Sequence, residues 1–146
     1  MSDFQQMSAG YLANHMARLF AVGLSKRLQA TGLAPAQFMV LLELWQADGR
    51  TQADLMGALD VEQATMANTL SRMDRDGLIE RRPSETDGRS RIVFLSDKAR
   101  ALEQAAKTAA WHQNEVALRG LDPEERGLFL SLMRKVIANM QRPDAP

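Results

Sequence analysis

The stretch that decides the fold is residues 51–96, TQADLMGALDVEQATMANTLSRMDRDGLIERRPSETDGRSRIVFLS. Its pattern predicts two short helices joined by a tight turn, followed by a two-stranded hairpin with a long polar tip. Thr51 and Asp54 have the spacing of a capping box, in which each side chain accepts a hydrogen bond from the other residue's backbone amide. The first helix should therefore begin just after Thr51, and the turn should fall at residues 60–62.

The second helix of this stretch, expected over residues 62–76, is amphipathic. Met66, Leu70 and Met73 recur at helical spacing and share one face. Gly77 follows, and a glycine in the left-handed conformation is a common end of a helix. The short or polar side chains at the first turn and on the rest of the surface belong to Gln63, Ala64, Thr65, Asn68, Thr69 and Arg72.

A surface of this composition is what a helix needs to read the major groove of DNA. Arginine can read guanine, and asparagine or glutamine can read adenine, through paired hydrogen bonds. The apolar face then anchors the helix on its own domain. The alternative is an ordinary solvent-facing helix surface, since amphipathic helices are common. The candidate DNA contacts on this helix are Gln63, Ala64, Thr65, Asn68, Thr69 and Arg72.

The hairpin favours the DNA-binding interpretation. Its strands are expected at residues 78–82 and 91–95, which are both β-prone. The tip between them contains the turn dipeptide Asp87-Gly88. Four arginines around one hairpin, directly after a helix-turn-helix, indicate contact with phosphates and with the minor groove. The candidate DNA contacts of the hairpin are Arg81, Arg82, Asp87, Arg89, Ser90 and Arg91.

In this order of elements the chain resembles the winged helix-turn-helix regulators of the multiple-antibiotic-resistance regulator (MarR) family. The resemblance extends from about Leu12 to Met140 and is most specific between Leu55 and Ser96, where the run Gly-Leu-Ile-Glu-Arg precedes the wing. It implies a mainly α fold with a small β-hairpin wing, and a homodimer on double-stranded DNA. The wing pattern of the family is matched by Asp87, Arg89, Val93, Leu95 and Ser96.

Two details of the resemblance are expectations about single residues. The family pattern suggests that Asp87 orients the nearby wing arginine, as a carboxylate can hold a guanidinium in a fixed fork. The alternative is that Asp87 is a simple turn residue. Ala34 stands where the family often has a capping serine or threonine, which implies a loosened start of the next helix, at a cost of about 1 kcal/mol.

The rest of the chain predicts long helices on both sides of this lobe. We expect them at residues 8–30, 35–48, 96–119 and 122–140, with an arm or a frayed end at 1–7 and a frayed tail at 141–146. The first helix and the last two carry more apolar surface than one small lobe can cover, and pairing of two copies is the simplest use of it. The alternative is a monomeric bundle. The expected organisation is a dimerisation region of residues 1–34 and 97–146, and a DNA-binding lobe of residues 35–96.

Composition excludes several classes of protein. The 146-residue chain contains 45% hydrophobic and 25% charged residues, as an ordinary globular protein does. Its formal net charge is zero, which counts mildly against nucleic-acid binding, although the hairpin is locally rich in arginine. The absence of cysteine excludes disulfides and thiol redox sensing. No apolar run approaches 18 residues and the N-terminus lacks a signal-peptide pattern, so we expect no membrane span and a cytoplasmic location.

An enzyme is not expected, because the sequence has no Gly-rich phosphate loop, zinc motif or catalytic triad spacing. We also expect no cofactor and no metal site. The function predicted is a homodimeric repressor that releases a near-palindromic operator when a small aromatic or phenolic effector binds. The alternatives are a winged-helix module for protein–protein contacts and a DNA-binding regulator without an effector.

The resemblance implies that an effector binds in a cleft between the dimer helices and the DNA-binding lobe. For each candidate the alternative is an ordinary core or surface residue of a helix. The candidate residues are His15, Met16, Arg18, Leu19, Trp45, Trp111 and His112.

Overall fold

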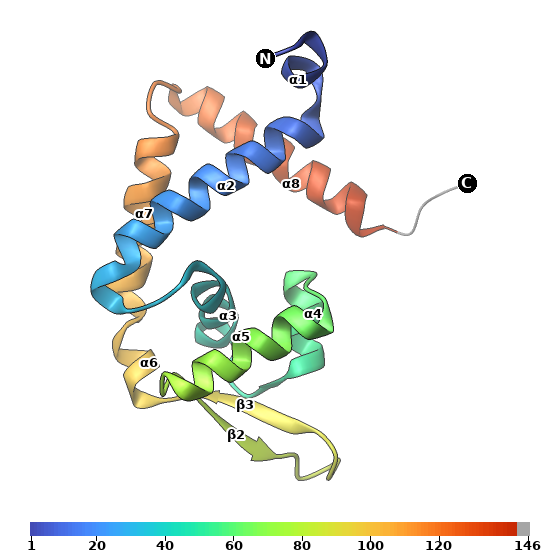
Figure 1. Cartoon of the computed structure of the whole chain (residues 1–146), viewed down its shortest axis with the longest axis vertical. Helices are drawn as coiled ribbons and strands as arrows, with labels where there is room; N and C mark the ends of the chain where they lie inside the picture. Colours follow the sequence, from blue (N-terminus) through green and yellow to red (C-terminus); the bar gives the residue numbers. More distant parts are fainter. Residues whose placement is uncertain (143–146) are drawn as a thin grey trace. The chain divides into compact units, whose positions relative to one another are not determined.

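The computed structural model of the chain describes residues 1–142 and is mainly helical, with one small sheet (Figure 1). The predicted fold class is thus confirmed. The chain divides into two compact units, Met1–Gln113 and the part from Asn114 onward. The elements are α1 (Asp3–Met7), α2 (Ala9–Leu28), a 3-10 turn η1 (Gln29–Thr31), α3 (Pro35–Gln46), β1 (Arg50–Thr51), α4 (Gln52–Leu59), α5 (Gln63–Arg75), β2 (Ile79–Pro83), β3 (Arg91–Leu95), α6 (Asp97–Ala101), α7 (Glu103–Ala117) and α8 (Pro123–Gln141).

The start of the chain differs from the expectation, because residues 3–7 form the short helix α1 rather than a frayed end. A capping box stabilises it. The Ser2 hydroxyl accepts from the amide of Gln5 at 3.3 Å, and the Gln5 side chain accepts from the amide of Ser2 at 2.7 Å. Ser8 then caps the longer helix α2 by accepting from the amide of Tyr11.

The core lies in the first unit, where α3, α4 and α5 pack together beside the sheet. Met66, Leu70 and Met73 of α5 are each 0–1% exposed, which confirms the predicted apolar face. Leu41 and Leu44 of α3 are fully buried in the same cluster. Burial of these side chains holds α5 on the lobe, and leaves its remaining surface outside.

The sheet has three antiparallel strands in the order β1-β3-β2, so the expected two-stranded hairpin is present as β2 and β3, and β1 is a third strand that was not expected. The additional strand β1 pairs Arg50 with Val93 and Thr51 with Ile92. A strand of two residues is too short to show a sequence alternation. Gly49, just before it, has a φ of +72°, and a Cβ there would lie 2.8 Å from the ring of Phe94. Glycine therefore permits both the backbone turn and the close approach of the ring.

The expected helix over residues 96–119 is broken into α6 and α7 at Leu102. The carbonyl oxygen of Ala99 accepts from the indole Nε1 of Trp45 at 3.1 Å and from the amide of Leu102 at 3.2 Å. In an unbroken α-helix that carbonyl would accept from the amide four residues later, and these two donors take its place. A side chain from α3 therefore accompanies the break, and sequence periodicity within the helix did not reveal it.

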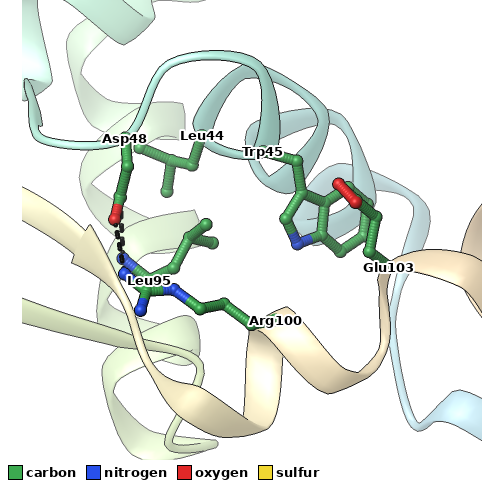
Figure 2. Close-up of a pocket in the computed structure, with 6 residues that line it drawn as sticks. All are labelled: Leu44, Trp45, Asp48, Leu95, Arg100 and Glu103. Atoms are coloured by element: carbon green, nitrogen blue, oxygen red, sulfur yellow. Dashed lines mark hydrogen bonds and ion pairs between the residues drawn. The ribbon is translucent and has the colours of Figure 1, made fainter.

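Asp48 joins the end of α3 to two other elements, as Figure 2 shows. One carboxylate oxygen accepts from the amide of Leu95 and the other accepts from the guanidinium of Arg100, both at 2.9 Å. Beside them is a cavity of about 280 Å³ lined by Leu44, Trp45, Asp48, Leu95, Arg100 and Glu103. The hydrogen bonds of Asp48 and Trp45 thus join the end of α3 to β3 and α6.

The second unit contains α8, which begins as predicted. Asp122 accepts from the amide of Glu125 at 2.8 Å, Glu125 accepts from the amide of Asp122 at 3.0 Å, and Pro123 occupies the first position. The helix continues to Gln141, one residue beyond its expected end. Of the expected frayed tail, residues 143–146 lie outside the described residues. None of the described helices is long and apolar enough to cross a membrane.

Candidate nucleic-acid interface

The recognition-helix candidate α5 exposes the side it was predicted to expose. Its buried face consists of Met66, Leu70 and Met73, so the opposite side points into solvent. Of the six candidate residues on this helix, Thr69 is half-buried and the others, Gln63, Ala64, Thr65, Asn68 and Arg72, are exposed.

The polar side chains on this surface differ in whether they already make hydrogen bonds within the protein. Gln63, Asn68 and Arg72 make no side-chain hydrogen bond or ion pair with any residue of the described chain, 1–142. Thr69 donates its hydroxyl to the carbonyl of Thr65 at 2.9 Å, one turn back on its own helix. The free donors and acceptors for reading a base are therefore Gln63, Asn68 and Arg72.

The start of α5 contributes backbone groups. Glu62 precedes the helix but makes no side-chain capping bond. The amides of the first turn have no partner within a helix. Such amides suit a phosphate oxygen, since the helix dipole also favours negative charge there. Ala64 has no polar side chain, so this amide is the group with which it could contact DNA.

The β2–β3 hairpin extends beyond the helices of the lobe (Figure 1). Its register pairs Ile79 with Leu95 at the base and Pro83 with Arg91 toward the tip. Pro83 lacks an amide hydrogen but is tolerated because β2 is an edge strand of the sheet. The hairpin thus carries the predicted wing residues away from the core.

The tip is closed by its own side chains. Asp87 accepts from the amide of Arg89 at 3.0 Å and from the hydroxyl of Ser90 at 2.9 Å. These hydrogen bonds lower the pKa of the Asp87 carboxyl, the amide bond being the stronger cause. Asp87 therefore holds the backbone of the turn, as the turn-residue alternative expects, and within residues 1–142 it makes no bond to an arginine guanidinium. Ser90 donates its hydroxyl hydrogen to Asp87, so it has no further hydrogen to donate to DNA.

The four wing arginines fall into two groups. Arg89 and Arg91 are exposed, and their guanidinium groups make no ion pair within residues 1–142. Arg82 pairs with Glu80 at 3.2 Å and lies 4.4 Å from the centre of the Phe94 ring. Arg81 points to the other face of the hairpin. Arg89 and Arg91 are thus the cations of this group that are free for a phosphate or a groove.

Arg81 connects the wing to the recognition helix. Its Nε lies 2.7 Å from a carboxylate oxygen of Asp74 in α5, in ion-pair contact without the alignment of a hydrogen bond. The side chain is only 25% exposed. Sequence reasoning assigned Arg81 to DNA and did not assign Asp74. Their seven-residue separation across a turn gave no periodic signal, because the contact depends on how β2 packs against α5.

The seven effector candidates are spread over three helices. His15 and Met16 of α2 are half-buried, whereas Arg18 and Leu19 are exposed. Trp45 uses its indole N–H within the lobe and lines the cavity of Figure 2. Trp111 and His112 of α7 are exposed and do not line that cavity. The structure therefore brings Trp45 into this cavity without the other six.

Comparisons with known proteins agree with this geometry. Residues 31–90 match the sequence model of the MarR family. The transcriptional regulator HosA of Escherichia coli is 31% identical over 105 residues, which are 72% of this chain and 78% of HosA. The fold is similar to that of a probable transcriptional regulator from Pseudomonas aeruginosa, with a TM-score of 0.84 and 27% identity, over 90% of this chain and 98% of the other. It is also similar to a MarR-family regulator from Silicibacter pomeroyi, with a TM-score of 0.75 and 28% identity, over 96% and 94% of the two chains.

Proposed function

The chain belongs to the MarR family of DNA-binding transcriptional regulators, which are not enzymes, and we propose that it is a homodimeric, ligand-responsive repressor. It binds a near-palindromic operator and releases it when a small aromatic effector binds. The observation that carries this proposal is the surface of α5, where Gln63, Asn68 and Arg72 stand free over a fully buried apolar face. A protein with this task works in the compartment that holds its DNA, which in a cell without a nucleus is the cytoplasm.

Self-association is supported by apolar surface that each unit leaves exposed. In the second unit, α8 has no buried residue, and Val136 and Ile137 are 51% and 47% exposed. In the first unit, Leu19 and Val22 of α2 are 60% and 55% exposed. Apolar surface of this kind on each unit favours an interface, and a second copy offers the same surface around a two-fold axis. In this proposal residues 1–34 and 97–146 form the dimer, and residues 35–96 bind DNA.

The proposed DNA contacts divide by role. Gln63, Asn68 and Arg72 read base edges in the major groove, while the first-turn amides of α5 bind a phosphate. Arg89 enters the adjacent minor groove and Arg91 lies on the backbone. A mutant MarR of Escherichia coli, whose fold this chain matches with a TM-score of 0.84 at 24% identity, was crystallised with operator DNA. That likeness supports the fold-level part of the proposal.

The repressor role and the effector are each proposed by analogy with a relative. The repressor NicR of Pseudomonas putida is 32% identical over 105 residues. DNA binding by BpsR of Bordetella bronchiseptica, which matches with a TM-score of 0.79 at 25% identity, is regulated by 6-hydroxynicotinic acid. An aromatic acid is thus the first class of effector to test. It must favour one arrangement of the dimer, and a coupling of the usual size would weaken operator binding by roughly tenfold or more.

The experiment that tests the proposal is selection of duplexes from a random library by the purified protein. We expect an inverted repeat with half-sites about 34 Å apart, bound by two chains. Addition of 6-hydroxynicotinic acid or related aromatic acids should then release the selected duplex. Selection of no duplex at low ionic strength, together with a monomer in sedimentation, would overturn the proposal. Selection of a duplex that no aromatic acid releases would remove only the effector.

The wing is tested separately with Arg89→Ala. Loss of one phosphate or minor-groove cation should weaken binding to the selected duplex strongly, and should reduce the salt slope of log K by roughly one unit. Gel shifts at several salt concentrations measure both quantities. Arg82→Ala is the matched control, because Arg82 already pairs with Glu80 and stacks on Phe94. Equal slopes for Arg89→Ala and the wild type would exclude Arg89 from the interface.

A further inference from the structure

Gln37 is the polar residue that the described part of the chain buries in its core, with 4% of its surface exposed. It occupies the third position of α3, and both ends of its amide are used. Its Oε1 accepts from the amide of Ala34 at 3.0 Å, which is the half of a capping box that needs no side chain at position 34. Its Nε2 donates to a carboxylate oxygen of Asp76 at 2.8 Å.

Asp76 ends the recognition helix. It is the C-cap of α5, and its other carboxylate oxygen accepts from Nε of Arg75 at 3.0 Å. Its backbone carbonyl accepts from Nζ of Lys98 in α6 at 2.7 Å. The hydrogen bonds from Arg75 and then from Gln37 lower the pKa of the Asp76 carboxyl. Arg75 and Lys98 are the charged groups that act on it. Gln37 and Asp76 thus connect the start of α3 to the end of α5 across 39 residues of sequence.

The fully buried contacts of α5 are of a different kind. Met66, Leu70 and Met73 hold the helix by burial of apolar surface, which has no preferred direction. Two packed helices can satisfy such contacts at more than one rotation or axial position. The hydrogen bond from the buried amide of Gln37 to the partly exposed carboxylate of Asp76 has a preferred direction and length, and leaving that buried amide without a partner is costly. The Gln37–Asp76 bond therefore selects one of these arrangements.

We propose that Gln37 is a positioning residue for DNA recognition, which acts through Asp76 to fix the C-terminal end of α5 on the first turn of α3. Asn68 and Arg72 lie in the two turns before that end, so a small rotation of the helix moves both reading side chains against the base edges. The proposal rests on the DNA-binding function of the chain and adds a residue that contacts no DNA itself.

The most direct variant is Gln37→Glu, which keeps the shape of the side chain. One oxygen of the new carboxylate can still accept from Ala34, but the other faces the carboxylate of Asp76. Two carboxylates at this distance cannot both stay ionised without strain, so one of them takes up a proton at a raised pKa. We expect the specific affinity for the selected duplex to fall about tenfold near neutral pH and to recover as the pH is lowered from about 7.5 to about 5.5.

The readout is the ratio of affinities for the selected duplex and for a scrambled duplex of the same length. A variant that is only less stable loses active protein equally for both duplexes, so its ratio stays unchanged. A displaced recognition helix lowers the ratio, because non-specific binding depends mainly on charge. The wild type and Gln37→Met, in which position 37 cannot titrate, provide the pH controls. Neither should show the acid recovery.

A second variant keeps the test decisive even if Gln37→Glu does not fold. In Gln37→Glu with Asp76→Asn the polarity of the hydrogen bond is reversed, since the asparagine amide can donate to the carboxylate introduced at position 37 while its oxygen accepts from Arg75. We expect this double variant to recover most of the wild-type affinity ratio near neutral pH. An affinity ratio of the double variant below the ratio of Gln37→Met would overturn the proposal. So would an unchanged ratio in folded Gln37→Glu. If the wild type selects no duplex at all, the DNA-binding function itself fails.

Discussion

The helices α5 and α8 carry similar apolar stripes but end in different surroundings. In α5 the stripe of Met66, Leu70 and Met73 is at most 1% exposed. In α8 the stripe that contains Val136 and Ile137 stays about half exposed, and no residue of the helix is buried. The same helical periodicity thus marks a face that its own unit covers in one case and a face that its own unit leaves open in the other. The difference teaches that an apolar stripe predicts burial but does not show whether the same chain or another molecule packs against it.

The largest effect that this comparison predicts is the loss of stability when the covered stripe is shortened. Leu70→Ala should lower the free energy of unfolding by about 3 kcal/mol, because a fully buried leucine leaves a cavity. Chemical denaturation measures this change. The matched truncation Leu132→Ala in α8, where the side chain is 49% exposed, should cost less than about 1 kcal/mol at concentrations too low for self-association. Equal losses would break the distinction between the two helices.

The next effect concerns the open stripe. Val136→Glu places a charge at a half-exposed apolar position, and should weaken the proposed dimer roughly a hundredfold if a second copy buries it. Sedimentation velocity over a range of protein concentrations provides the measurement. Ser131→Glu adds the same charge to an exposed site away from the stripe and should leave the association unchanged. A Val136→Glu protein that dimerises like the wild type would exclude α8 from the interface.

The polar side of α5 gives a smaller and more selective effect. Asn68→Ala should reduce discrimination at one base pair of each half-site by about 1–3 kcal/mol, with little change in non-specific binding. Repeating the selection with the variant would reveal a relaxed position in the motif. Gln104→Ala removes the same kind of group from an exposed site on α7 and should select the wild-type motif. An unaltered motif for Asn68→Ala would show that this side chain reads no base.

The smallest effect compares the two helix starts. Asp122 caps α8 through a reciprocal pair of hydrogen bonds with Glu125, so Asp122→Ala should lower the free energy of unfolding by about 1 kcal/mol. Glu62 makes no side-chain capping bond at the start of α5, so Glu62→Ala should change stability by much less. Denaturation followed by circular dichroism can resolve the two. A larger loss for Glu62→Ala would contradict the assigned caps.

Several parts of the fold could be predicted because their causes are local. The caps at Thr51 and Asp122 follow from residues three positions apart, and Gly77 ends α5 with a φ of +70°. The short helix α1 had a comparable signal, since Ser2 and Gln5 have capping-box spacing. The sequence therefore contains a local signal for this helix as well.

The wing shows where such prediction stops. The sequence indicates that arginines gather on the hairpin, but their availability depends on neighbours. Arg81 is held by Asp74, whereas Arg89 remains free of ion pairs within residues 1–142. Asp87 binds the backbone of its own turn. Each of these outcomes depends on distances between groups that only the folded hairpin brings together.

The sequence by itself determined the helical periods, the caps, the turn glycines and the family pattern, because each of these depends on residues within a few positions of one another. The tertiary structure alone decided the strand at Arg50, the break between α6 and α7 beside Trp45, and the bond from Gln37 to Asp76. Those features join groups that lie 39 residues or more apart in the chain, or pair strands too short to carry a pattern. Long-range contacts form when the chain packs, and local propensity does not determine which distant group will be the partner.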